Sequence, residues 1–594
     1  MHTLERNDAK GVNTAFPTKL SETGLFRDVK RHEMAEGIRE FEPNARQWQD
    51  GAISRYFAAF PDTSSATLFD KPRKLPGQVY WHDFRMQFPK DAVLVKTLTL
   101  NVYVENKLQK KRVETQLLHF DGEDWHGYSF AWRDDQSDAE LVPADGAEKV
   151  FRVANAVTFP LASKPEELGL QQTWTFHSRN QCMQCHNAWS EYTLAFNPRQ
   201  LNGGFQGRPF AFGGEIKIPN YLIELNEQGY IRRVGADDKP LPVFDTTTAA
   251  KEPRLPTAFQ MQNVRNEDVA RAYLHVNCAH CHRFGGGGGQ VVLELDYAKQ
   301  LKETGILDVV PKQGDFGITD ARIIKPGEPF KSVLLYRMTK FGRGRMPHLG
   351  SESPDSAGLR LIDNWISHLA LEKWKEPEVN REKPEQNLRS TDTAFPFSFQ
   401  MSTQGLDGQA MRQALAVAAK LEPGPVRDLF EGYLPADPKG RKLGSNPRPQ
   451  SILSLKGDAT KGEVIFFNKD MKCVNCHKIG DKGTALGPDL TAIGKTRTRA
   501  ELLESLLQPS LQVEPQFAAY LVQTKDEKTF TGLLVKRDDK QVVLRDAENK
   551  EIVLAAENLE SVRPSRLSLM PDGQMAGLRP QEAADLLEFL TTRR

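Results

Sequence analysis

Six cysteines and three histidines of this chain recur in one fixed spacing. The repeated motifs are Cys182, Cys185, His186; Cys278, Cys281, His282; and Cys473, Cys476, His477. Two thiols three residues apart can each add to one of the two vinyl groups of a haem, and a histidine directly after the second thiol can bind the iron. The chain has six cysteines in all, so the motifs use every thiol. The pattern predicts three covalently bound haem c groups, each with its iron.

Other chemistries use pairs of cysteines at this spacing. Zinc ribbons, iron-sulfur sites and redox dithiols all do so, but none of them requires a histidine after each second cysteine. A zinc site would need two pairs brought together, which the spacing permits. An iron-sulfur cluster needs four thiolates, and six cannot be shared evenly between clusters. Haem is therefore the preferred interpretation, and zinc with a leftover pair is the alternative.

Composition bears on partners and on location. The 594 residues include 79 basic and 78 acidic side chains, giving a net charge of +1. This balance gives no reason to expect nucleic acid as a partner. Mean hydropathy is −0.53, and no stretch approaches the apolar run that spans a bilayer, so we expect no transmembrane segment.

Covalent attachment of haem takes place outside the bacterial cytoplasm, so the natural precursor should carry an export signal. The first residues, Met1 to Asp8, are polar and lack an apolar central region. We therefore expect a leader that has been removed and a periplasmic or otherwise exported protein.

Length and pattern predict a multidomain α+β protein, in which an N-terminal antiparallel β domain is followed by mainly α-helical cytochrome c domains. The last of these should carry a small β insertion. The predicted parts are a β-rich domain at 1–165, a loop-rich first haem segment at 166–256, a cytochrome c domain for the second haem at 257–375, a linker with a helical segment at 376–449, and a cytochrome c domain for the third haem at 450–594 with its β insertion at 518–556.

Alternating apolar residues predict strands at 93–104, 113–120 and 125–132 of the N-terminal domain. Aromatic residues here suggest two roles, a sugar-binding platform or ordinary packing of a sheet, and the second is the commoner one. The aromatic residues are Trp81, Trp125, Tyr128 and Trp132.

Helical periodicity frames the second and third motifs. One helix should run from Asn266 into the second motif, and a closing helix should begin after Pro354. In the last domain a helix near Asp458 precedes the third motif, and Pro580 starts the closing helix. Shorter helices are expected at 221–227 and 409–421, while 376–392 and 435–449 are predicted spacers.

The sixth iron ligand decides whether a haem only carries electrons. A methionine opposite histidine closes the iron and raises its potential. Met346 and Met570, each followed by proline and placed before a closing helix, are the predicted ligands of the second and third haems, with Met338 and Met575 as competitors. A carbonyl of the turn at 487–489 should accept the N–H of His477. The first haem has no such methionine, and its candidates are Met86, His119, His177, Met261 or an empty site.

Two family resemblances follow from these residues. The final segment, from Gly457 through Gly487-Pro488-Asp489-Leu490 to Met570-Pro571, resembles the haem-binding domain abundant in Planctomycetes and Verrucomicrobia. Residues from about 20 to 371 resemble a bacterial family of c-type cytochrome proteins with two such motifs, through Leu20 to Phe26, Leu274 to His282 and Arg345-Met346-Pro347. The resemblances imply periplasmic electron transfer alongside sugar dehydrogenases.

The sequence thus predicts a multihaem cytochrome c that accepts electrons from a periplasmic dehydrogenase or another redox protein and passes them on. No catalytic residue is predicted, and an electron carrier is favoured over a catalyst. The alternative is a haem peroxidase or another small-molecule oxidoreductase, with an open first haem and His119 or His177 as acid and base. A third hypothesis makes the N-terminal β domain a carbohydrate-binding or partner-docking module.

Overall fold

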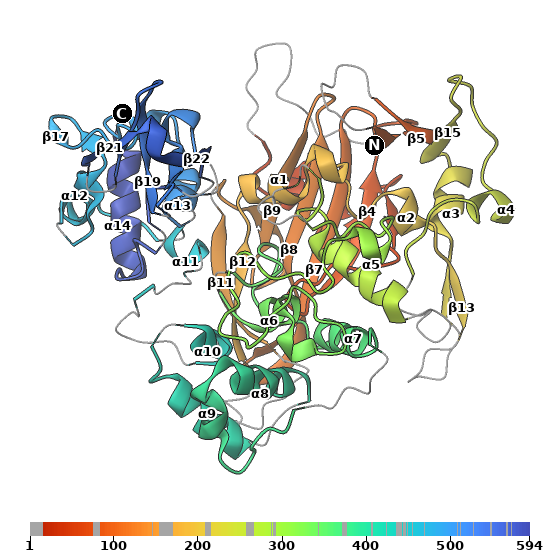
Figure 1. The fold of residues 1–594 in the computed structure, drawn as a ribbon. Helices are drawn as coiled ribbons and strands as arrows, with labels where there is room; N and C mark the ends of the chain where they lie inside the picture. Colours follow the sequence, from red (N-terminus) through yellow and green to blue (C-terminus); the bar gives the residue numbers. More distant parts are fainter. Residues whose placement is uncertain are drawn as a thin grey trace. The chain divides into compact units, whose positions relative to one another are not determined.

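The computed structural model of this chain divides into two compact units, Met1–Leu434 and Pro435–Arg594 (Figure 1). The described residues are 16–74, 83–144, 146–153, 170–207, 216–256, 266–284, 286, 288, 293–342, 344–370, 377–404, 408–422, 424–434, 442–443, 447, 449–453, 455–468, 470–507, 509–510, 513–526, 528–546, 549–565, 568–571 and 573–593. No helix of this described part is long and apolar enough to cross a membrane.

A large antiparallel sheet organises the first unit. Its main path runs β10-β9-β8-β7-β11-β12, and β4 pairs with both β7 and β3. The strands are β3 (Arg39–Phe41), β4 (Ile53–Ala59), β7 (Ala92–Val104), β8 (Lys107–Phe120), β9 (Trp125–Trp132), β10 (Ala139–Leu141), β11 (Ala147–Val153) and β12 (Leu170–Phe176). The antiparallel N-terminal β region and its three predicted strands are confirmed.

Smaller sheets flank the large one. β15 (Ile231–Val234) pairs in parallel with β5 (Ala66–Arg73), and β6 (Phe84–Gln87) pairs antiparallel with β5. Two further hairpins are β1 (Phe26–Asp28) with β2 (Glu33–Met34), and β13 (Phe205–Gly207) with β14 (Ile216–Ile218).

The two faces of the large sheet have different neighbours, because alternate residues of a strand point to opposite sides. Phe57, Val95, Leu117 and Phe130 pack into an apolar cluster on one face. Trp125 and Trp132 are buried at 6% and 3% exposure, so they pack in the interior and form no sugar-binding platform. Trp81 lies outside the described residues.

Short helices lie between the sheet and the second motif. They are α1 (Arg179–Cys185), α2 (Pro198–Leu201), α3 (Tyr221–Glu227), α4 (Thr246–Ala249) and the 3-10 turn Ala188–Ser190. α1 packs against β9, and α3 has the bounds that its apolar spacing predicts.

The second motif follows α5 (Asn266–Cys278), which packs against α7 (Ser356–Ser367). Both helices begin where the sequence predicts. Their close crossing depends on Gly358, where an added Cβ would lie 2.3 Å from the hydroxyl of Tyr273. Leu359, Ile362 and Trp365 of α7 are buried in the same core, together with α6 (Val333–Thr339).

The β region and these helices form one body. The backbone N–H of Trp48 donates to Asn277 at 2.9 Å, and its indole N–H donates to the carbonyl of Ser353 at 2.9 Å. The carboxylate of Asp50 accepts from the N–H of Ser353 at 2.8 Å. The sheet therefore holds the loop that precedes α7.

A linker was predicted from residue 376 to residue 449, but residues 377–434 are folded as part of the first unit. Their helices are α8 (Thr391–Thr403), α9 (Gly408–Ala418) and α10 (Pro425–Asp428). Phe395, Phe397 and Met401 of α8 are buried in the core that contains Trp365. α9 corresponds to the helical segment predicted at 409–421. α8 was not predicted, because its Pro396 and its Ser and Thr residues favour turns over helices.

The second unit is built on a helix crossing. α12 (Ala459–Phe466) packs on α14 (Pro580–Thr591), and Gly462 permits the contact because a Cβ there would lie 2.0 Å from the carbonyl oxygen of Asp585. α11 (Gln450–Leu453) and α13 (Arg499–Leu507) complete the helical core. The hairpin of β16 (Lys478–Ile479) and β17 (Lys482–Gly483) follows the third motif.

The predicted β insertion is a five-stranded antiparallel sheet in the order β21-β20-β19-β18-β22. Four strands agree with the sequence, namely β18 (Ala519–Thr524), β19 (Thr529–Arg537), β20 (Gln541–Arg545) and β21 (Glu551–Ala555). The fifth, β22 (Leu559–Pro564), extends the insertion past the predicted end at residue 556 and pairs with β18. Its polar residues and final proline give a weak strand signal.

Candidate haem-binding site

The first motif lies on α1, whose start is fixed by Ser178. The Ser178 hydroxyl accepts from the N–H of Gln181, and the Gln181 side chain accepts from the N–H of Ser178, which closes a capping box. The helix is pressed onto β9 at Gly127, where an added Cβ would lie 2.7 Å from Cβ of Cys182. The sheet therefore sets the position of the first thiol.

His186 is oriented by the chain that follows it. Its Nδ1 lies 2.6 Å from the carbonyl oxygen of Tyr192 and donates a hydrogen bond to it. Burial, with smaller contributions from His280 and Lys96, lowers the pKa of His186 to about 4, against the effect of the Tyr192 carbonyl. The ring is neutral at pH 7, and Nε2 is the atom left for a metal ion.

The second motif continues from the last turn of α5. Burial lowers the pKa of His282, so this imidazole is neutral as well. Its Nδ1 is buried without a hydrogen-bond partner among the described residues. A Cβ at Gly288 would lie 2.8 Å from this Nδ1, so the glycine-containing loop packs directly on the ring. Residues 285, 287 and 289–292 lie outside the described part of the chain.

The fold brings the first two motifs together. The sulfurs of Cys185 and Cys281 and a ring nitrogen of His280 all lie within 4.8 Å of one another. A hydrogen bond between the two thiols raises the pKa of Cys185 and lowers that of Cys281. The sequence gives no sign of this contact, because it joins segments that are distant along the chain.

Polar contacts hold this junction. Arg283 donates to the carbonyl of Trp189 at 2.7 Å and pairs with Asp296 at 3.2 Å. Asp296 also pairs with Arg199 at 2.7 Å. Burial favours the neutral acid, but Arg199, His275 and Arg283 together hold the pKa of Asp296 below its ordinary value.

The third motif lies in the second unit, where Cys473–Asn475 forms a 3-10 turn. Nδ1 of His477 donates to the carbonyl oxygen of Pro488 at 2.9 Å, as the sequence predicts for this turn. Gly487 also packs on the ring, since a Cβ there would lie 2.9 Å from Cε1 and 3.2 Å from Nδ1. Burial lowers the pKa of His477, against the effect of the Pro488 carbonyl.

The donor sets fit haem. Each motif has two thiols and a neutral imidazole, and at His186 and His477 a backbone carbonyl fixes Nδ1 and leaves Nε2 for iron. The cluster at Cys185 also suits a soft metal, but a structural zinc site takes four ligands, and three donors meet among the described residues. A zinc ion at that cluster would use neither His186 nor His477, the two rings that the carbonyls orient.

The predicted methionine ligands differ from their competitors in packing. Met338 and Met575 are buried at 5% and 1% exposure in the apolar cores of their units. Met346 and Met570 are half-buried. Side chains already used in a core are poor candidates for iron, so Met346 and Met570 remain the predicted ligands.

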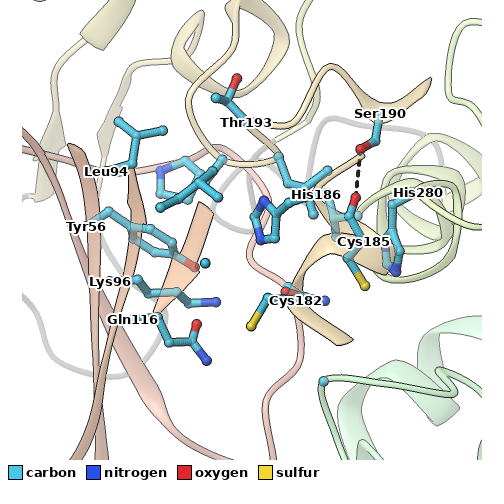
Figure 2. Close-up of a pocket in the computed structure, with 18 of the residues that line it drawn as sticks. Tyr56, Leu94, Lys96, Gln116, Cys182, Cys185, His186, Ser190, Thr193 and His280 are labelled. Carbon is cyan, nitrogen blue, oxygen red and sulfur yellow. Dashed lines mark hydrogen bonds between the residues drawn. The ribbon is translucent and has the colours of Figure 1, made fainter. Parts of the chain in front are cut away.

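A cavity opens beside the first motif, between α1 and the large sheet (Figure 2). Cys182, Cys185 and His186 line one side of it. Tyr56, Leu94, Lys96 and Gln116 reach into it from the strands. This cavity is the space next to the first pair of thiols, and its sheet wall is partly polar.

The sequence candidates for the sixth ligand of the first haem are poorly placed. Met86 is buried in an apolar cluster, and His119 binds Asp91 at 3.3 Å; neither lines the described cavity. His177 does line it, but its Nε2 accepts from the N–H of Gly350 at 3.1 Å and the ring also bonds to the Thr175 backbone. Met261 lies outside the described residues.

The sequence reasoning missed the sheet side of this cavity. Lys96 and Glu114 are charged residues in strands that otherwise bury apolar side chains. A charged residue within such a strand was the available signal, because burial of an unpaired charge is costly and needs a reason.

All three motifs offer the same donor set, two thiols and one imidazole. No known protein-family model matches the chain. One similar protein is "Cytochrome c-553-like" of Synechocystis sp. (strain ATCC 27184 / PCC 6803 / Kazusa), which is 31% identical over 72 residues. The match covers 12% of this chain and 65% of that protein.

Proposed function

We propose that this chain is a triheme c-type cytochrome that transfers electrons. Haem iron held in this way exchanges one electron at a time between its ferrous and ferric states. Cys182 with Cys185, Cys278 with Cys281, and Cys473 with Cys476 would hold the three haems. His186, His282 and His477 would bind the irons, with Met346 and Met570 opposite the second and third histidines.

The contact between Cys185 and Cys281 carries the proposal. Thioether sulfurs are bonded to the rim of the porphyrin, so two sulfurs this close bring two porphyrin rims together. Two haems brought together in this way would give electrons a direct path from one to the other. The partial likeness to a cytochrome c adds support.

The partner is expected to be a periplasmic dehydrogenase or another redox protein, and the location to be outside the cytoplasm. The third motif, in its own compact unit, would be a separate point of entry or exit for electrons. The large sheet contributes a wall to the first site, so the N-terminal β region serves haem binding in addition to any docking role.

Intact mass and a pyridine haemochrome assay of the protein matured in an exporting host test the haem count. We expect three haems per chain in the wild type and two after Cys473→Ala with Cys476→Ala. A polypeptide without added haem would contradict the proposal. Stopped-flow mixing with periplasmic dehydrogenases then tests the direction of flow, and reduction by dithionite alone would count against the electron-transfer role.

The cavity beside the first motif favours a second candidate, a small-molecule oxidoreductase with an open first haem. The two histidines expected to act as acid and base are poorly placed for this role, since His119 does not line the cavity and His177 accepts a hydrogen bond from the N–H of Gly350. Binding of cyanide to one haem per chain, with peroxide turnover, would support this candidate over a pure carrier.

A further inference from the structure

A row of polar side chains crosses the wall of the first-haem cavity. Tyr56 pairs with Lys96, Lys96 with Gln116 and Gln116 with Ser129, across β4, β7, β8 and β9. The neighbouring row of the cavity wall holds Leu94, Leu118 and Gly127, which are apolar. A lysine in the middle of such a sheet, away from its edges, requires a physical explanation.

The ordinary explanation for Lys96 would be that it neutralises the charge of Glu114, but the contacts of Glu114 argue against this. Glu114 is buried at 1% exposure, but it already accepts hydrogen bonds from the Ser129 hydroxyl at 2.6 Å, the Gln116 amide at 3.1 Å and the Trp174 indole at 2.9 Å. No ion pair joins it to Lys96 in the described part of the chain. The carboxylate is therefore satisfied by other groups.

The amine of Lys96, by contrast, has few polar contacts. It lies 5.3 Å from the centre of the Tyr56 ring, and within the described residues it makes neither a hydrogen bond nor an ion pair. Figure 2 shows its side chain extending from β7 into the cavity, toward Cys182 and the ring of His186. α1 carries the histidine on one side of the cavity, and β7 carries the lysine on the other.

We propose that Lys96 is the sixth ligand of the first haem, with its amine nitrogen on the iron opposite His186. This inference rests on the proposed function, because it needs haem at the first motif. The bond forms by donation of the nitrogen lone pair after the ammonium has released its proton to solvent, and no electron changes hands. It explains why a lysine is placed where Met86, His119 and His177 are unsuited.

The environment supports a neutral amine. Burial lowers the pKa of Lys96 to about 7, with Arg46 acting in the same direction and Glu114 opposing it. An exposed lysine keeps its proton far above neutral pH and cannot bind a metal ion.

Electron paramagnetic resonance of the fully oxidised holoprotein tests this assignment. The wild type should show low-spin haem alone, because a strong ligand closes each iron. Lys96→Arg keeps length and charge beside Glu114, but guanidinium does not lose its proton, so one high-spin haem per chain should appear. Lys110→Arg, on an exposed part of β8, is the matched control and should leave the spectrum unchanged.

Lys96→Met covers the case in which the arginine variant fails to fold. A thioether can bind the same iron, so this variant should stay low-spin with a changed spectrum and a raised potential for one haem. Three low-spin haems in Lys96→Arg, an unchanged spectrum in Lys96→Met, or a wild-type high-spin signal that Cys182→Ala with Cys185→Ala removes would each overturn the inference. Haem counted in the same samples separates this failure from failure of the proposed function.

Discussion

Single atoms at the third motif decide how firmly its histidine is held. Nδ1 of His477 is fixed by the Pro488 carbonyl, and Gly487 occupies the remaining space beside the ring. The sequence predicted the carbonyl contact because a Gly-Pro turn follows the motif. It could not predict Lys96, since the role of a lone lysine depends on which groups the fold brings around it.

Gly487→Ala should displace the ring of His477. The added methyl group would lie 2.9 Å from Cε1, and relief of that overlap should lower the stability of the second unit by about 1–3 kcal/mol. Thermal unfolding followed by the absorbance of the third haem measures the effect. Gly577→Ala, where a Cβ would meet nothing within 4 Å, should change neither stability nor spectrum. Equal behaviour of the two variants would contradict this account of the ring.

At the scale of elements, periodicity predicted the helices that frame the second and third motifs, because each buries a regular apolar stripe. The same reasoning found three strands of the large sheet. It missed α8, whose Pro396 and hydroxyl residues resemble a connector, and β22, which is polar. The contact of the first two motifs is a tertiary property that no local pattern encodes.

The close contact between α12 and α14 can be tested by asking whether a substitution at Gly462 raises or lowers the stability of the second unit. Alanine in place of a mid-helix glycine ordinarily stabilises a helix by up to about 1 kcal/mol. At Gly462 the Cβ would lie 2.0 Å from a backbone carbonyl of α14, so Gly462→Ala should instead destabilise the second unit by about 1–3 kcal/mol. Denaturant unfolding gives the value, with the exposed Glu463→Ala as control. A stabilising effect would show that the helices are not in this close contact.

Asp296 joins α2, α5 and the second motif, and its contribution depends on pH. The pKa of Asp296 is lower in the folded protein than in the unfolded chain. Its ion pairs therefore stabilise the fold fully at pH values above the unfolded pKa of about 3.9. This stabilisation is lost as the pH falls through the folded pKa. Asp296→Asn should destabilise the first unit by about 1.5–3 kcal/mol at pH 7, by the loss of charged hydrogen bonds. The difference from wild type should shrink below about pH 4.

Thermal unfolding of wild type, Asp296→Asn and the exposed control Asp62→Asn between pH 3 and pH 7 supplies the comparison for this prediction. Asp62 makes no ion pair or side-chain hydrogen bond in the described part of the chain, so its variant should follow the wild type throughout. A stability gap between Asp296→Asn and wild type that stays constant over this range would mean that the carboxylate charge is not what holds the junction.

At the scale of the whole molecule, the contact between the first two motifs predicts how the proposed haems would influence one another. The first two motifs lie in one compact unit and meet at Cys185 and Cys281, whereas the third lies in the second unit and packs in a core of its own. An oxidised haem next to another makes the second easier to reduce, because charges interact strongly where water is excluded. Loss of the first haem in Cys182→Ala with Cys185→Ala should therefore lower the midpoint potential of the second. Loss of the third haem, through Cys473→Ala with Cys476→Ala, should remove one third of the haem and serves as the comparison. Spectroelectrochemical titration of both variants measures these shifts, and an unmoved second haem after loss of the first would refute the coupling that the Cys185 and Cys281 contact implies.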